Sequence, residues 1–213
     1  MTRPTIALFT GDPAGIGPEL VEKLLTDTTL ANQANVVLIA QKSVLHAPAY
    51  VAWHTWSGLN APVFTRGVAQ ASNGEFMLHA LNEGVRLVQN GVADAFCFAP
   101  LNKSALRQAG MKQEDELRWF SDILKFDGIC GELNVLKNLW TSRVTSHVAL
   151  KEVSGLLTVD KVANAIRMIT QSLQAAGIAH PRIAVCGLNP HNGDNGNYGD
   201  EEARIIEPGV AKA

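Results

Sequence analysis

Cysteine, net charge and long apolar runs are all scarce in this sequence, and each shortage excludes a class of protein. Three cysteines in 213 residues do not make a disulfide framework or a thiolate metal site, so we expect Cys97, Cys130 and Cys186 to be buried thiols in a reducing cytoplasm. A net charge of −2 gives no electrostatic case for nucleic acid or an anionic membrane. No apolar run reaches transmembrane length, and the N-terminal residues do not resemble a signal peptide. We therefore expect a cytoplasmic protein without nucleic-acid or membrane partners.

A recognisable nucleotide-binding loop is also missing. The glycine-rich turn Gly11–Gly17 follows an apolar run and precedes Pro18, which suits the first turn of a helix. It has no Walker lysine, and its glycines do not match the dinucleotide-binding spacing. Its backbone N–H groups could face an anion, but the bare pattern is more typical of a structural turn. The turn therefore argues against an ATP-using enzyme.

Short apolar runs alternate with helical patterns along the chain. The apolar runs predict strands over 5–10, 36–40, 95–99, 142–150 and 183–188, with an edge strand over 51–56. The helical patterns cover 19–25, 73–90, 103–109, 117–124 and 158–177, and another opens at 200–202. This order predicts an α/β fold, with a mostly parallel sheet and helices on both faces. A charged segment near residue 110 predicts two α/β domains, 1–110 and 111–213.

Polar side chains follow several of these strands. The loop 188–202 contains His191, and His147 lies near the end of the strand predicted over 142–150. In a parallel sheet both histidines would project from the carboxyl edge, where a divalent-metal site can form. Taken alone, the loop is equally typical of a hydrophilic connection with an incidental histidine. Lys103 could hold a phosphate or carboxylate, although its spacing alone is more typical of a solvated lysine at a helix start.

These motifs together resemble the 4-hydroxythreonine-4-phosphate dehydrogenase family, and they occur in the family's order along the whole chain. The stretches that carry the resemblance are Thr10–Glu19, Asn73–Gly74, Ala99–Lys103, Thr145–Lys151, Gly187–His191 and Gly199–Glu202. The first and the last two of these are the most specific.

The resemblance implies an NAD-dependent enzyme similar in fold to the isocitrate and isopropylmalate dehydrogenases. It implies a homodimer with a shared active site in an interdomain cleft. His147 and His191 would be two of three histidines that hold a divalent cation, for which Zn, Co, Mn, Ni and Mg are all open. Lys103 and Asp12 would be the catalytic residues: Lys103 would contact the small-molecule substrate, and the loop around Asp12 would line the cleft. The implied reaction is oxidation with decarboxylation of 4-phosphohydroxy-L-threonine.

One departure from the family concerns the substrate. A His-Thr-Glu triplet usually follows the lysine loop, whereas Glu116, Leu117 and Arg118 stand there in this chain. An acid in place of histidine adds repulsion toward a phosphate, although Arg118 could restore a contact with an anion. The substrate could therefore instead be a four-carbon sugar-acid phosphate or an aromatic cis-dihydrodiol. Residues 116–118 remain the expected substrate-binding triplet, and a solvated acidic face is the structural alternative.

A second departure concerns length. The family's chains continue beyond the point that corresponds to Ala213, and they supply a third metal histidine, much of the NAD site and the rest of the sheet. We therefore expect this sequence to be the N-terminal portion of a truncated chain in which both domains are incomplete. Two histidines alone make an incomplete catalytic metal site. The alternative to an enzyme is therefore a non-catalytic remnant that binds a ligand or a partner.

Overall fold

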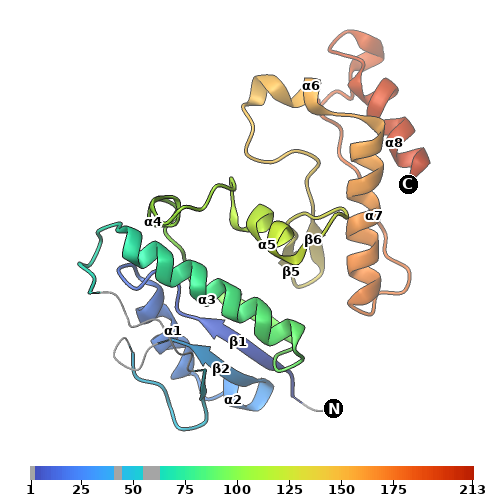
Figure 1. The fold of residues 1–213 in the computed structure, drawn as a ribbon. Helices are drawn as coiled ribbons and strands as arrows, with labels where there is room; N and C mark the ends of the chain where they lie inside the picture. Colours follow the sequence, from blue (N-terminus) through green and yellow to red (C-terminus); the bar gives the residue numbers. More distant parts are fainter. Residues whose placement is uncertain (1–2, 41–44, 55–62) are drawn as a thin grey trace. The chain divides into compact units, whose positions relative to one another are not determined.

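The protein folds as two compact units, residues 1–114 and 115–213, in a computed structural model (Figure 1). The structure describes residues 3–40, 45–54 and 63–213. Within these ranges no helix is both long enough and apolar enough to pass through a bilayer.

The first unit contains a parallel sheet of four strands. Its spatial order is β3 (Ala52–His54), β2 (Asn35–Ile39), β1 (Thr5–Phe9) and β4 (Ala95–Phe98), and every neighbouring pair is parallel. The strands predicted over 5–10, 36–40 and 95–99 are confirmed. The predicted edge strand is confirmed over 52–54, and its last two residues lie outside the described ranges. The parallel sheet of the predicted fold class is therefore present.

Helices cover both faces of this sheet. Along β1, Leu8 packs in one cluster with Val21 and Leu25 of α1 (Gly17–Leu25). The neighbouring Phe9 turns to the other face, where its ring lies 6.0 Å from that of Phe76 in α3 (Ala71–Gln89). Figure 1 shows α3 running across this second face. Side chains alternate between the faces of a strand, so one apolar run supplies both layers of the core.

The remaining helices of this unit are short. They are α2 (Leu30–Gln33) and α4 (Lys103–Gln108), and α4 packs against the first half of α3. The helices predicted over 19–25, 73–90 and 103–109 are thus confirmed within one or two residues at each end.

Strand β4 corrects two expectations. Its apolar run predicts a buried strand, but the second half is exposed, and Phe98 keeps 39% of its surface accessible. Cys97 is therefore exposed, Cys186 is also exposed and Cys130 is half-buried, so the prediction of buried thiols is wrong. The physical reason for Cys97 is position, because β4 is the last strand in the order and has a neighbouring strand on one side only. All three thiols are free, as expected.

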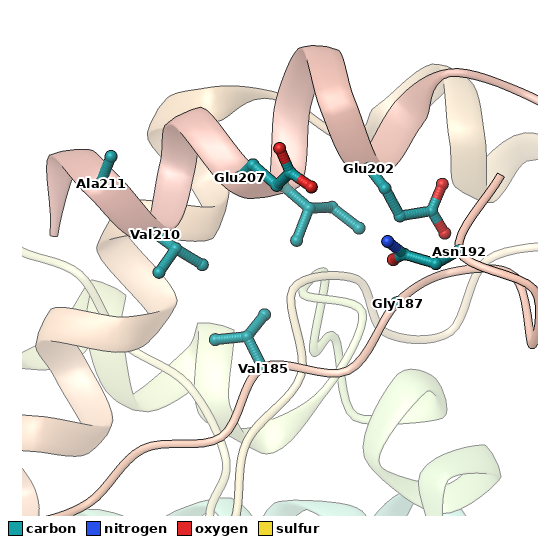
Figure 2. A pocket seen from close by; sticks show the side chains of 8 residues that line it. Val185, Gly187, Asn192, Glu202, Glu207, Val210 and Ala211 are labelled. Carbon is teal, nitrogen blue, oxygen red and sulfur yellow. The ribbon is translucent and has the colours of Figure 1, made fainter. Parts of the chain in front are cut away.

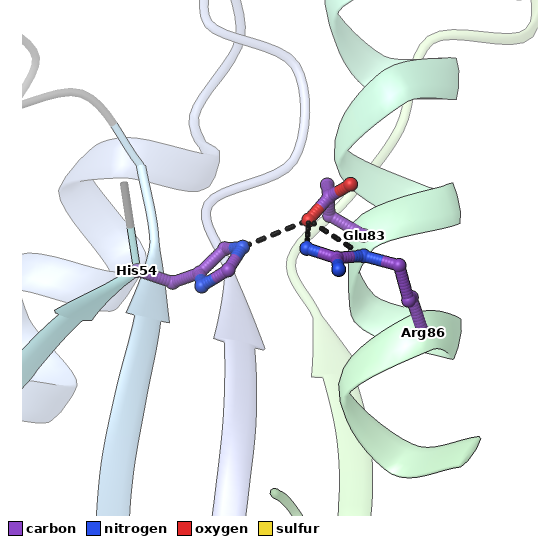
Figure 3. Close-up of polar contacts among 3 residues, drawn as sticks. All are labelled: His54, Glu83 and Arg86. Atoms are coloured by element: carbon purple, nitrogen blue, oxygen red, sulfur yellow. Dashed lines mark hydrogen bonds and ion pairs between the residues drawn. The ribbon is translucent and has the colours of Figure 1, made fainter. Parts of the chain in front are cut away.

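The edge strand β3 is tied to α3 by a polar contact (Figure 3). The Nε2 atom of His54 lies 2.9 Å from Oε2 of Glu83, and Arg86 donates to the same oxygen at 2.7 Å. Burial of the Glu83 carboxyl works to raise its pKa, but the hydrogen bonds from Arg86 and His54 outweigh burial and lower the pKa below its usual range. The contact therefore stabilises the ionised carboxylate at the margin of the sheet.

The second unit is mainly helical. Its regular elements are α5 (Glu116–Leu124), the antiparallel hairpin β5 (Asn134–Leu136) and β6 (Leu139–Thr141), α6 (Val153–Leu156), α7 (Val159–Ala175), a π-helical turn over Glu202–Ile206 and α8 (Glu207–Lys212). Short 3₁₀ turns lie at Leu150–Glu152 and Asp194–Gly196. The helices expected from 117 and 158 are confirmed, and Thr158 caps α7 by accepting from the Lys161 N–H at 3.1 Å, as predicted.

Two strands predicted for this unit are wrong. Residues 142–149 and 183–188 have no regular structure, and most of their side chains are exposed. A strand requires a neighbouring strand to pair with its backbone, and neither segment pairs with one in the described ranges. His147 has a φ of 56°, which also interrupts extended backbone at that point.

The π-helical turn has a local cause. Pro208 lacks an N–H group and so cannot donate to the carbonyl four residues earlier, that of Arg204. A widened turn just before a proline is one way in which a helix accommodates this missing donor. The helical pattern expected from Asp200 is therefore present, but its first turn is widened.

Candidate functional site

The loop after β1 is held tightly against the loop after β4. Gly11 has a φ of 75°, and a side-chain Cβ at this position would lie 2.4 Å from the Pro100 carbonyl oxygen, so only glycine fits. The next residue, Asp12, is only 5% exposed and donates its N–H to the Pro100 carbonyl at 3.0 Å. The predicted turn is therefore present, and Gly11 allows its backbone to lie close to the backbone at Pro100.

Both carboxylate oxygens of Asp12 accept hydrogen bonds. Oδ1 accepts from the Ala14 N–H at 2.9 Å, and Oδ2 accepts from the side-chain amide of Asn102 at 3.2 Å. The oxygen of that same amide accepts from the Ala105 N–H at 3.1 Å and so caps α4. Asn102 thus joins the two loops, and Lys103 follows it as the first residue of α4 with an exposed side chain.

Asn102 is a residue that the sequence patterns do not single out, although a signal is available. Asparagine immediately before a helical pattern is a common N-cap. What the sequence does not indicate is the second bond, because Asp12 lies 90 residues earlier in the chain.

Helix α4 is also held from the side of α3. A Cβ on Gly74 would lie 2.0 Å from the Ala105 carbonyl oxygen, so the two helices touch backbone to backbone. The neighbouring Asn73 is fully buried and donates to the Val68 carbonyl at 3.3 Å, while its Oδ1 has no partner within the described ranges. Lys103 therefore projects from a helix whose start is fixed on two sides.

In the second unit, the loop that carries His191 has its own support. The His191 N–H donates to the side-chain oxygen of Asn189 at 2.7 Å, and the Asn189 N–H donates to Oε1 of Glu202 at 2.9 Å. The Asn189 N–H holds the pKa of Glu202 below its usual range, although burial of this carboxyl works in the opposite direction. A chain of two hydrogen bonds thus runs from the buried Glu202 to the backbone of His191.

Glu202 also lines a cavity of about 310 Å³ (Figure 2). Its other oxygen, Oε2, is buried and has no hydrogen-bond partner among the described residues. The apolar lining of the cavity comes from Val185, Ile206, Val210 and Ala211, and its polar lining comes from Glu202, Glu207 and Asn192. Gly187 and Asn192 of the loop that carries His191 also line this cavity, which lies within the second unit.

The two predicted metal histidines are both accessible. His191 is exposed, and its ring lies 5.7 Å from that of Tyr198. His147 is exposed in the irregular segment before Leu150. Throughout the described part of the chain, no three His, Cys, Asp or Glu side chains gather closely enough to hold a metal ion. The structure thus offers two imidazole donors, and their joint role remains a prediction.

The expected substrate triplet forms the first turn of α5. Asp115 caps this helix by accepting from the Arg118 N–H at 2.8 Å. The Arg118 side chain is exposed, while Glu116 and Leu117 are half-buried. Asp12 and Lys103 belong to the first unit, whereas the triplet, His147 and His191 belong to the second.

Comparison with known proteins gives a consistent family. A model of the pyridoxal phosphate biosynthetic protein PdxA family matches residues 16–213. A Pseudomonas aeruginosa protein provisionally named 4-hydroxythreonine-4-phosphate dehydrogenase 2 is 46% identical over 99% of this chain and 69% of its own length. A Pectobacterium atrosepticum protein named D-threonate 4-phosphate dehydrogenase is 31% identical over 96% of this chain and 70% of its own.

A solved structure agrees with these matches. The 4-hydroxythreonine-4-phosphate dehydrogenase from Klebsiella pneumoniae superposes with a TM-score of 0.87 at 29% identity, over 99% of this chain and 70% of that one. The similarity therefore extends through both compact units.

Proposed function

The chain belongs to the PdxA family of pyridoxal phosphate biosynthetic proteins, and from this membership we propose that it serves as an NAD-dependent, divalent-metal-dependent dehydrogenase of a phosphorylated hydroxy acid. The single observation that carries the proposal is the family match over residues 16–213. The proposal is supported by the hydrogen bonds that fix the backbone around Lys103 and His191, the residues to which it gives roles in binding.

Within this proposal, Lys103 binds the phosphate or carboxylate of the substrate. Its ammonium group is exposed on the first turn of α4, and a lysine in such a position acts as a point charge toward an anion. Asp12 lies in the neighbouring loop after β1, with its carboxylate turned inward. The unit 1–114 would thus supply the anion contact.

His147 and His191 would hold a divalent cation. Two exposed imidazoles suit such an ion, and the Asn189 bond fixes the backbone of one of them. When both groups are bound, the cation supplies Lewis acidity at the substrate hydroxyl and the nicotinamide supplies the hydride acceptor.

The substrate is either 4-phosphohydroxy-L-threonine or D-threonate 4-phosphate. The first carries an ammonium group next to its carboxylate, and the second carries a neutral hydroxyl there. Glu116 would attract the ammonium group, while Arg118 would attract the anionic ends of either molecule. The name of the Pectobacterium relative favours D-threonate 4-phosphate as the second candidate.

The test is to follow NADH formation from each substrate with Zn²⁺, Co²⁺ or Mn²⁺, and to titrate the protein with Zn²⁺ by calorimetry. His191→Ala should weaken Zn²⁺ binding by about 100-fold or more, because even loss of a group supporting a ligand costs about 10–100-fold. His180→Ala, which removes an exposed histidine of the same unit, is the matched control. Full activity in His191→Ala would refute its role as a ligand. A folded protein without turnover of either substrate would favour a non-catalytic binding protein.

A further inference from the structure

Asn102 and Asp12 form a partly buried link between the loop after β1 and the loop after β4. The link consists of two hydrogen bonds made by one amide group: its NH₂ donates to Asp12 at 3.2 Å, and its oxygen accepts from Ala105 at 3.1 Å. An amide with both ends engaged has one orientation, because a rotation by half a turn would place donor against donor and acceptor against acceptor. The position of residue 102 is therefore defined from both sides.

The link also orders the glycine loop. Asp12 uses its second oxygen to accept from the Ala14 N–H, and its own N–H donates to the Pro100 carbonyl. With both oxygens accepting hydrogen bonds inside the protein, the carboxylate faces its neighbours and not the solvent. Its environment is that of a group that holds a loop in place.

From this geometry we infer that Asp12 and Asn102 are positioning residues for Lys103, acting as a carboxylate–amide clamp that sets the start of α4. The inference rests on the proposed contact between Lys103 and the anionic end of the substrate. Lys103 is bonded directly to Asn102, and the contact of Gly74 with Ala105 holds the same first turn of α4 in place. A change at the clamp is therefore transmitted to the lysine and its helix start.

Exchanging the side chains of residues 12 and 102 tests whether they act by holding each other in place or through the carboxylate at position 12 itself. Asn102→Asp keeps an oxygen for the α4 cap but removes the donor and sets two carboxylates against each other. In the double variant Asp12→Asn with Asn102→Asp, the amide and the carboxylate change places and the net charge is that of the wild type. The hydrogen bond between positions 12 and 102 can then form in the opposite direction, and oxygens still face Ala14 and Ala105.

Two measurements on the full chain follow each variant. Amide hydrogen exchange at Ala14 reports the clamp, and an NMR titration with inorganic phosphate reports anion binding near Lys103. Asn102→Asp should speed exchange at Ala14 and weaken phosphate binding, each by about tenfold or more, the ratio expected for losing a hydrogen bond to a charged group. The double variant should return both to within about threefold of the wild type. Asn82→Asp, the same change on the exposed surface of α3, should alter neither.

Asn102→Ser covers the case in which the charged variant does not fold. Serine retains a helix cap but is too short to reach Asp12 and adds no charge. It should shift both measurements in the same direction as Asn102→Asp.

The outcomes distinguish this inference from the proposed function. Failure of the double variant to recover, in a folded protein, overturns the clamp, because the hydrogen bond between positions 12 and 102 can form again in that variant and the clamp requires both readouts to return with it. Unchanged phosphate binding in Asn102→Asp, together with weakened binding in Lys103→Ala, also overturns it and leaves the proposed function standing. Unchanged binding in Lys103→Ala refutes the role of the lysine, and the positioning inference falls with it.

Discussion

Replacing Gly74 with alanine is the sharpest test of how α4 is held. An added Cβ would stand 2.0 Å from the Ala105 carbonyl oxygen and 2.7 Å from Cβ of Ala109. Carbon and oxygen atoms need about 3.4 Å, so α3 and α4 would have to separate by roughly 1.4 Å at this point. The obstacle is backbone, which cannot move aside by a change of rotamer.

Two opposing terms set the magnitude. Alanine in a helix interior is favoured over glycine by about 1 kcal/mol, and overpacking of a close contact costs about 1–3 kcal/mol. A clash with a carbonyl oxygen belongs at the upper end of that range, so Gly74→Ala should destabilise the protein by about 2 kcal/mol. For a chain of this size the midpoint of thermal unfolding should fall by about 4–8 °C.

The assay combines thermal unfolding with amide exchange at Ala109. The Ala109 N–H donates to the Ala105 carbonyl at 3.0 Å, which is the group that the new methyl would displace. Gly155→Ala is the matched control, because Gly155 lies in helix α6 with no atom within 4 Å of the place that a methyl group would take, and it should leave stability unchanged or raise it slightly. A Gly74→Ala protein as stable as this control would refute the backbone contact.

Two further predictions concern acids whose pKa is lowered by hydrogen bonds, Glu202 and Glu83. Glu202→Gln should weaken Zn²⁺ binding by about 10–100-fold and speed exchange of the Asn189 N–H, as expected for loss of a group supporting a metal ligand. Unchanged Zn²⁺ affinity would contradict the role of the Glu202–Asn189–His191 hydrogen bonds in supporting His191. The lowered pKa of Glu83 means that its ionised form stabilises the fold above the ordinary glutamate value of about 4.3, and that this stability is lost as pH falls through the lower folded-state value. Urea unfolding between about pH 6 and about pH 3 should therefore show a steeper acid loss in the wild type than in Glu83→Gln, whereas Glu75→Gln, on the exposed side of α3, should keep the wild-type slope.

The first unit could be predicted from the sequence because its information is local. Strands β1 and β2 are continuous apolar runs, and α3 has apolar residues at helical spacing. The residue pattern of each segment alone therefore predicts its secondary structure. Burial between two helical layers then requires a parallel sheet. The exposed half of β4 differs from the prediction because an apolar run indicates a strand but does not show whether another element packs on that strand.

The second unit is predicted less well because strands depend on partners. Residues 183–188 are as apolar as β1, yet they form no strand where no described neighbour pairs with them. Helix α7 needs no such partner for its backbone, and its Thr158 cap and apolar stripe suffice to predict it. The hydrogen bonds of a helix are internal, whereas those of a strand are not, and this difference separates the correct predictions from the wrong ones.

The same difference applies to the candidate site. Sequence patterns indicate Lys103 and His191, which are exposed side chains on polar loops, but not the amides of Asn102 and Asn189 that hold those loops. In both cases an asparagine near the exposed residue bonds to a buried carboxylate: the Asn102 side-chain amide donates to Asp12, and the Asn189 backbone N–H donates to Glu202 at the start of the π-helical turn. A charged anchor inside the protein gives a stronger hydrogen bond than a neutral one, and a stronger bond restricts the loop more. Each loop therefore combines a fixed backbone with a side chain free to meet a ligand, which is the arrangement that a binding or catalytic site requires.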